Sequence, residues 1–309
     1  MLESAEPGLD VELVTVRTSG DERPAAPGSP VAESVAPSPR ELAGGPGDKS
    51  RFVKEIEDAL LDGRADLAVH SAKDVPGELP EGLAIVGVPA RIDARDAVCG
   101  AASLAELPAG ARVGTSSLRR RAQLLAARDD LEVRELRGNV DTRLRRLAEG
   151  DFDAVVLARA GLERLGRGDG AAIGLQEMTP APGQGCLMLA APADDERIGD
   201  LAARVTDRSS LVRLTAERAV SAALDATCHT PIGVYGELDP SGRLSVATFV
   251  GAPDGAAWVR DHVEGDGASP SELGAIAAER LLSAGAAEIL AAAEAVGEAR
   301  PRGARRTEA

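Results

Sequence analysis

Short apolar runs with the character of β-strands alternate with helix-like segments through the middle of this chain, and this alternation constrains the fold most. Strands are predicted at Leu67–Val69, Leu83–Val88, around Val113, at Leu131–Leu136 and at Ala154–Leu157. Helices are predicted over Phe52–Leu60, with Gly63 as the residue that ends the helix, from Ser117, from Asn139 and near Gly161. Strands that alternate with helices in this way favour a parallel, doubly wound sheet.

Two regions depart from the alternation. Residues 19–50 are rich in proline and glycine, which predicts a long mobile loop after an expected strand at Val11–Val16. From about residue 228, three strand patterns separated by turns predict an antiparallel meander, and a helix follows from Ser269-Pro270. The predicted fold class is therefore α/β, with two lobes built on doubly wound sheets and a small C-terminal α+β domain.

The composition excludes several classes of protein. The net charge of −15 and the pI near 4.8 argue against a general nucleic-acid binder and against a membrane-surface protein. Three widely spaced cysteines and three histidines make neither a disulfide framework nor a metal site. The N-terminus has no basic, apolar leader, and no apolar run is long enough to span a membrane, so a cytoplasmic location is expected. Because aromatic residues make up only 2% of the chain, Ala, Val, Leu and Ile must form the core.

The first candidate site is the segment His70–Pro76, directly after a predicted buried strand. Ligands of open α/β sheets bind at the carboxyl ends of the strands. An aspartate in this loop, Asp74, could hold a cationic nitrogen or stabilise positive charge that develops in a transition state. The alternative is an ordinary surface Lys-Asp pair.

The second candidate is Gly114–Arg121, a strand-to-helix junction with small hydroxyl residues followed by three arginines. Free N–H groups at a helix N-terminus favour anions, and arginines in the first turn are unfavourable there unless an anion is bound. Residues 112–146 contain ten arginines and five acidic residues, a net charge of +5. This pattern indicates a site for a polycarboxylate or a phosphorylated small molecule. The alternative is a proteome that simply prefers Arg on solvated faces.

The third candidate is the segment Asp225–Gly233, which contains Cys228 and His229. Adjacent residues point apart in a strand, so the two do not form a catalytic pair. An isolated cysteine is usually a small buried residue, and this interpretation is retained for Cys99 and Cys186. Cys228 differs because it occurs in a predicted loop.

Taken together, these segments resemble the porphobilinogen deaminase (hydroxymethylbilane synthase) family of tetrapyrrole biosynthesis. The resemblance covers about residue 51 to the C-terminus, and its motifs occur in the family's order. The matching segments are Phe52–Glu55, His70–Pro76, Gly114–Arg120, Leu136–Val140 with Thr142–Leu144, Ala160–Leu165, Pro182–Gly185, Glu217-Arg218, and Cys228 with Pro231–Gly233.

The resemblance implies two lobes like those of periplasmic solute-binding proteins, with the active site in the cleft between them. It implies a domain 1 of residues 1–90 with 187–207, a domain 2 of residues 91–186 and a domain 3 of residues 208–309. It also implies a dipyrromethane cofactor attached by a thioether to Cys228, to which four porphobilinogen molecules are added before hydroxymethylbilane is released. The expected partner is this small molecule, without nucleic acid, membrane or metal, and the expected state is a monomer.

The resemblance also assigns roles to individual residues. Asp74 is the implied catalytic residue. The residues implied to hold the cofactor are Cys228, Ser71, Lys73, Thr115, Ser117, Arg119 and Arg120, and those implied to line the substrate path are Arg137, Arg143 and Arg164.

The sequence departs from the family at its start. The family's first βα unit has no match here, and Gly44–Gly47 only partly matches the family's glycine-rich loop. Loss of that unit would expose neighbouring strand edges. Either the gene starts upstream or the chain is a divergent form with reduced activity, and the missing unit also raises the hypothesis of a catalytically inactive homologue. Another hypothesis is a two-lobe protein that binds a small anion, and Cys228 argues against it, because a binding protein has no need of a cofactor-attachment cysteine.

Overall fold

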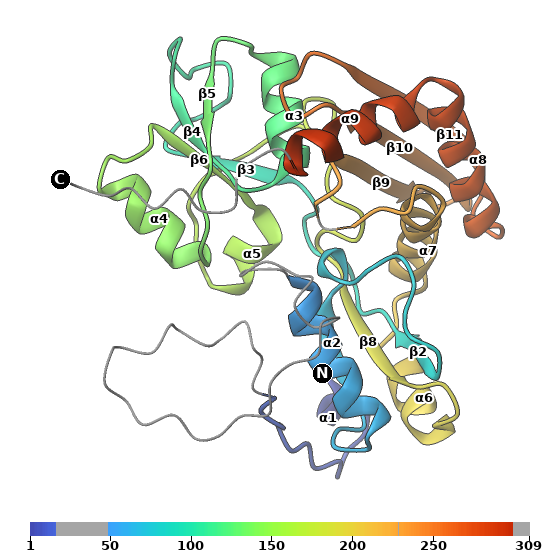
Figure 1. The fold of residues 1–309 in the computed structure, drawn as a ribbon. Helices are drawn as coiled ribbons and strands as arrows, with labels where there is room; N and C mark the ends of the chain where they lie inside the picture. Colours follow the sequence, from blue (N-terminus) through green and yellow to red (C-terminus); the bar gives the residue numbers. More distant parts are fainter. Residues whose placement is uncertain (17–48, 228, 299–309) are drawn as a thin grey trace.

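The computed structural model describes residues 1–16, 49–227 and 229–298. Its strands form three separate sheets, and helices pack on each (Figure 1). The α/β fold class with two lobes and a C-terminal domain is confirmed. The helices are α1 (Leu2–Ala5), α2 (Lys49–Leu61), α3 (Leu118–Ala127), α4 (Val140–Ala148), α5 (Arg159–Arg164), α6 (Glu196–Ala203), α7 (Arg208–Ala223), α8 (Pro270–Ser283) and α9 (Ala286–Glu298), with a 3-10 turn η1 (Ala72–Asp74).

The first sheet has three strands, and its middle strand comes from far along the chain. The order is β1 (Ala68–Ser71), β8 (Leu187–Pro192) and β2 (Leu83–Gly87). Both outer strands pair with β8 in antiparallel fashion, so the predicted parallel arrangement is wrong for this sheet. The reason is that β8 returns to the lobe in the opposite direction after the chain has built the second lobe.

The second sheet has five strands in the order β5 (Glu132–Arg134), β4 (Arg112–Gly114), β6 (Ala154–Ala158), β3 (Asp96–Cys99) and β7 (Ala171–Ala172). The strands β5, β4 and β6 are parallel, as predicted, and β3 and β7 are antiparallel to their neighbours. Successive residues of β6 enter different cores: Val156 packs with Leu124 of α3, and Val155 packs with Leu162 of α5. Both faces of this sheet are therefore covered, which explains its uninterrupted apolar strands.

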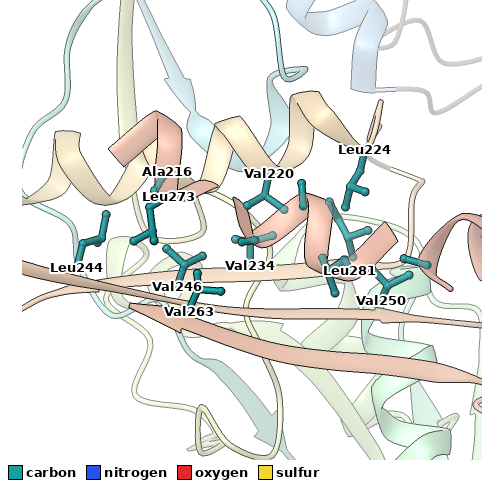
Figure 2. Close-up of a cluster of buried hydrophobic side chains, with 14 residues drawn as sticks. Ala216, Val220, Leu224, Val234, Leu244, Val246, Val250, Val263, Leu273 and Leu281 are labelled. Carbon is teal, nitrogen blue, oxygen red and sulfur yellow. The ribbon is translucent and has the colours of Figure 1, made fainter. Parts of the chain in front are cut away.

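The third sheet is the predicted meander, in the order β11 (Trp258–Asp266), β10 (Arg243–Gly251) and β9 (Ile232–Leu238). One face packs against α7, α8 and α9 through small and branched apolar side chains (Figure 2). Helix α7 also contributes Leu214 to the core of the first lobe, whereas its Ala216 and Val220 belong to the core of the third sheet. One helix thus joins two cores.

The helix boundaries follow the predicted signals. Asn139 begins α4, and its side chain accepts a hydrogen bond from Thr142 N at 2.9 Å. Helix α2 ends with Gly63 in the left-handed region (φ +68°), where Gly63 N and Arg64 N bond back to the last turn. These features are local and depend on few neighbours.

The expected strand at Val11–Val16 is wrong, because no strand forms there. Leu13 is 91% exposed, and none of the sheet strands in the described residues pairs with the segment. β-propensity reflects the fit of side chains to a covered sheet surface, so a segment without a partner strand gains little from it. β1 lies at the edge of the first sheet, and its Val69 is 58% exposed. Of the loop predicted over residues 19–50, Lys49 and Ser50 belong to α2. The rest of that loop lies outside the described residues.

Within the described parts of the chain, no helix combines the length and apolar character that a membrane span requires.

Candidate active site

The loop that carries Asp74 leaves the carboxyl end of β1, as predicted. Ser71 ends the strand, and Lys73 and Asp74 belong to η1; all three side chains are half-buried. The turn is fixed by its backbone, because Ala72 N donates to Cys186 O at 3.1 Å and Val75 N donates to Ala72 O. The loop is therefore held at the sheet edge where an α/β fold binds ligands.

Two close backbone approaches hold this loop from both sides. A Cβ atom added to Gly183 would lie 2.9 Å from Ala72 Cβ, so the 181–186 loop packs directly on η1. A Cβ added to Gly77 would lie 3.1 Å from Ala222 Cα, so the other end of the loop lies against α7. Neither position has room for a side chain without movement of the backbone.

The N-terminus of α3 forms the second predicted feature. Ser117 begins the helix, and its hydroxyl accepts from Arg120 N at 3.4 Å. Thr115 is buried, and its hydroxyl accepts from Ser117 N at 3.2 Å. The small hydroxyl residues thus organise the junction between β4 and α3.

The two arginines after this junction bind a carboxylate of the protein itself. Arg119 Nη1 lies 2.8 Å from Asp96 Oδ2, and Arg120 Nη2 lies 2.7 Å from Asp96 Oδ1. Burial alone would raise the pKa of Asp96, but the charges of the two guanidiniums outweigh it and hold this pKa well below its usual range. Sequence reasoning missed Asp96, although an acidic residue that opens the apolar run of β3 was a detectable signal.

The buried polar contacts continue from Asp96 toward the other lobe. Gln184 Nε2 donates to Asp96 Oδ1 at 3.0 Å, and Gln184 O accepts from Arg91 Nε at 2.9 Å. Arg91 then pairs with Glu217 of α7 at 2.6 Å. Burial opposes the charge of Arg91, but Glu217 raises its pKa.

Glu217 completes this chain of contacts, because its carboxylate also accepts from the backbone N–H groups of Gly183 and Gly236 at 2.6 and 2.7 Å. It is fully buried. We call the set Asp96, Arg119, Arg120, Gln184, Arg91 and Glu217 the junction network. It links the second sheet, the 181–186 loop, α7 and β9 through one line of buried polar groups.

Arg143 has a different environment from the other predicted arginines. Its Nε donates to Gly138 O at 2.8 Å, and its Nη2 donates to Ser116 Oγ at 3.3 Å. Burial and then the charge of Arg120 lower its pKa. No carboxylate pairs with it within the described part of the chain. A desolvated guanidinium without a counter-ion is suited to an anionic ligand.

Arg137 and Arg164 do not share the contacts of Arg143. Arg137 pairs with its neighbour Glu135 at 2.6 Å, and its side chain is 64% exposed. Arg164 is exposed, and its Nη2 donates to Gly185 O at 3.0 Å. Arg164 therefore contacts the loop beside η1, whereas Arg137 is paired at the surface.

Most arginines in the 112–146 window have acidic partners at the surface, and three of these partners lie outside the window and were not in its charge count. The surface pairs are Arg112–Asp153, Arg128–Asp130, Arg134–Glu132, Arg137–Glu135, Arg145–Glu149 and Arg146–Asp151. The arginines of the window outside these surface pairs are Arg119, Arg120 and Arg121 in α3, and Arg143.

The predicted attachment residue Cys228 lies outside the described residues, but the segment before it is well defined. After α7, Asp225 N donates to Ala222 O and Ala226 N donates to Ser221 O, with Asp225 at φ +48°. This pattern is a Schellman ending of the helix. Thr227 and Thr230, which flank Cys228 and His229 in sequence, bond to each other through Thr227 N and Thr230 Oγ1 at 2.8 Å.

Two family models match this chain in sequence. Residues 1–200 match "Porphobilinogen deaminase, dipyromethane cofactor binding domain", and residues 211–283 match "Porphobilinogen deaminase, C-terminal domain". The chain belongs to the porphobilinogen deaminase family. Its function is that of a hydroxymethylbilane synthase, a transferase of tetrapyrrole biosynthesis that assembles four porphobilinogen molecules on a dipyrromethane cofactor.

Solved structures of other proteins share only part of the porphobilinogen deaminase fold seen here. YhfZ from Shigella flexneri is 19% identical, with a TM-score of 0.31 over 55% of this chain and 74% of its own. A periplasmic substrate-binding protein of an ABC transporter from Coxiella burnetii is 17% identical, with a TM-score of 0.32 over 50% of this chain and 76% of its own. A TRAP periplasmic solute binding protein from Desulfovibrio salexigens is 12% identical, with a TM-score of 0.32 over 51% and 58%. Likenesses of this size decide nothing about function.

The residues near α3 suit the cofactor of a porphobilinogen deaminase. Three atoms of the junction network, Asp96 Oδ2, Arg119 Nε and Gln184 Oε1, are buried and have no hydrogen-bond partner in the described residues, although Asp96 Oδ2 is ion-paired with Arg119. Such groups are costly unless a ligand or water completes them. Among these atoms Arg119 Nε is a donor, and together with Arg143 it provides positive charge for a group that carries several carboxylates, whereas the acceptor Gln184 Oε1 needs a donor from the ligand or from water.

Proposed function

We propose that this chain builds hydroxymethylbilane with Asp74 as its catalytic residue and with dipyrromethane held by a thioether to Cys228. The observation that carries the proposal is the arrangement around the C-terminal end of α7. The Asp74 loop packs against Ala222, and the chain reaches Cys228 six residues later in sequence. The helix residue that contacts the catalytic loop is thus only six residues before the attachment residue in sequence.

The other two cysteines support Cys228 as the nucleophile. Burial raises the pKa of the Cys99 thiol and of the Cys186 thiol to about 11. A protonated, shielded thiol is a poor nucleophile. Both cysteines also sit in apolar cores, as expected from the sequence.

In the proposed mechanism, bound dipyrromethane supplies the pyrrole carbon to which the first porphobilinogen is joined. The carboxylate of Asp74 stabilises the positive charge that develops on the pyrrole nitrogen as porphobilinogen loses ammonia. The loop contacts of Ala72 and Gly77 hold this carboxylate in place, so little reorganisation is needed at the moment of reaction.

The remaining roles follow the family. Ser71, Lys73, Thr115, Ser117, Arg119 and Arg120 would hold cofactor carboxylates, and Arg137, Arg143 and Arg164 would line the substrate path. For Arg119 and Arg120 this role has to coexist with their ion pairs to Asp96. Arg143 is the arginine of these three best suited to a substrate carboxylate, because its guanidinium is desolvated and has no acidic partner among the described residues, whereas Arg137 is paired and Arg164 is exposed.

We assign the domains as residues 1–90 with 187–207, 91–186 and 208–309. The pairing of β8 with β1 and β2 supports the return of residues 187–207 to the first domain. The sheet of β3 to β7 supports the second domain, and the meander supports the third. The monomeric state and the cytoplasmic location stay predictions.

The test is the intact mass of the purified protein and of two cysteine variants. We expect an adduct with the mass of two pyrrole units on the unchanged chain and on Cys99→Ser, and no adduct on Cys228→Ser. An adduct that persists on Cys228→Ser would refute the attachment residue. No adduct on any of the three would favour an inactive form or an anion-binding protein.

Asp74→Ala tests the catalytic role. We expect it to keep the adduct and to lose nearly all formation of hydroxymethylbilane, because the charge on the pyrrole nitrogen is no longer stabilised. The matched control is Asp62→Ala, since the Asp62 side chain is 64% exposed and pairs only with Arg64 in the described residues. Unchanged turnover in Asp74→Ala would refute the assigned role.

A further inference from the structure

Arg218 of α7 is a desolvated arginine that the proposed mechanism does not use. Its Nη2 donates to Gly77 O at 2.8 Å, at the end of the loop that carries Asp74. The side chain is half-buried, and burial lowers its pKa. No carboxylate forms an ion pair with it in the described ranges, although the preceding residue, Glu217, pairs with Arg91.

The contact joins the loop to the helix at a second point. Gly77 also packs against Ala222, which lies one turn after Arg218 in α7. A Cβ atom added to Gly77 would lie 3.1 Å from Ala222 Cα. Arg218 therefore holds the same residue of the loop that the helix backbone touches. Two contacts from one helix fix both the position and the orientation of this end of the loop.

The other arginine in the middle of α7 serves a local purpose. Arg213 Nε donates to Ser209 O of the same helix at 3.1 Å, and its Nη2 donates to Ser210 Oγ at 3.3 Å. It makes no hydrogen bond to the 72–77 loop. Arg218 thus differs from Arg213 in reaching across to another part of the chain.

We propose that Arg218 is a positioning residue, which sets the Asp74 loop against the segment that leads from α7 to Cys228. The inference rests on the proposed function, because it takes Asp74 as the catalytic residue. The bond from the guanidinium to Gly77 O keeps the loop at one distance from α7, and α7 ends four residues before Thr227. Without this bond the Asp74 carboxylate is still present, but the loop no longer holds it in one position.

The first experiment compares steady-state kinetics of the cofactor-loaded enzyme with those of Arg218→Met and Arg218→Lys. For Arg218→Met we expect kcat to fall at least about tenfold, since small misplacements of a reacting group are costly. KM for porphobilinogen should change less than about twofold, the pattern of an interaction needed only in the transition state. Arg218→Lys, which can still donate to Gly77 O, should recover part of kcat.

The matched control is Arg213→Met, which removes a positive charge from the same helix and leaves the loop contact in place. It should keep kcat and KM. Intact mass must show the adduct on every variant, and thermal unfolding must show that each is folded. If Arg218→Met raises KM and keeps kcat, Arg218 binds a substrate carboxylate and the proposal is wrong. Unchanged kinetics would also refute it.

Gly77→Ala provides a second test that leaves the charge of Arg218 untouched. The added Cβ would crowd the backbone of Ala222 and displace the same end of the loop. We expect a lower kcat with KM retained, and a double variant with Arg218→Met that is no worse than the more impaired single variant. Fully multiplicative losses would mean that Arg218 acts independently of the loop. If the unchanged chain itself makes no hydroxymethylbilane, the proposed function fails as well.

Discussion

The arginines of the junction network and the surface arginines of the second lobe carry the same charge but serve different purposes. Arg119 and Arg120 share one fully buried carboxylate, and Arg91 shares another with backbone N–H groups. Arg112 and Arg134 instead pair with acidic side chains at the surface that remain exposed to solvent. Burial, and not the number of arginines, therefore separates the groups that hold the lobes together from those that only balance surface charge.

Asp96→Asn should produce the largest effect, because it leaves two buried guanidiniums without a counter-ion. Removal of one partner from a buried pair costs about 3–5 kcal/mol of unfolding free energy. Urea unfolding of the adduct-bearing protein measures this loss. If Asp96→Asn loses no more unfolding free energy than Arg134→Gln, burial does not distinguish the two groups of arginines.

The dependence of stability on pH should show a smaller effect of the same origin. The pKa of Asp96 is held below its unfolded value of about 3.9, so its contribution is fully present above that pH. As the pH falls below about 4, the unfolded chain takes up a proton that the folded protein does not, and stability falls by up to about 1.4 kcal/mol per pH unit.

Unfolding of the unchanged chain and of Asp96→Asn at several pH values tests this prediction. The difference in stability between the two should be constant from pH 7 to about 5 and should shrink as the pH falls below about 4. A difference that stays constant down to pH 3 would contradict a carboxylate that is ionised in the folded protein.

Arg134→Gln should have the smallest effect. Its partner Glu132 is about as exposed as Arg134 itself, and solvent screens the pair. We expect the midpoint of urea unfolding and the formation of hydroxymethylbilane to match those of the unchanged chain. A clear loss of stability would show that the surface pairs act as a connected set.

Local features of the fold were predictable, and long-range ones were not. Ser117 and Asn139 begin their helices as predicted, because each cap depends on the next three residues. The antiparallel first sheet was not predictable, since β8 is separated from its partners by a whole lobe. The strand pattern at Val11–Val16 misled because a propensity does not supply a partner strand.

The candidate site divides in the same way. The loop around Asp74 was found because a polar run follows a buried strand. Asp96 was visible as an acidic residue at the start of β3, but its pairing with Arg119 joins β3 to α3, two elements distant in sequence, and no local pattern predicts that pairing. The charge of the arginine window, in contrast, overstated the site. Three of its arginines pair with acidic residues just beyond the window, Glu149, Asp151 and Asp153, which the net charge of +5 did not include.

The return of β8 to the first sheet has a consequence for how the chain folds during synthesis. Within the described residues, β1 and β2 pair only with β8, so this sheet cannot form until residues 187–192 have left the ribosome. The second sheet uses only strands between residues 96 and 172 and is complete earlier. The second lobe can therefore assemble first. Until β8 is available, β1 and β2 have unpaired edges, which are a target for chaperones.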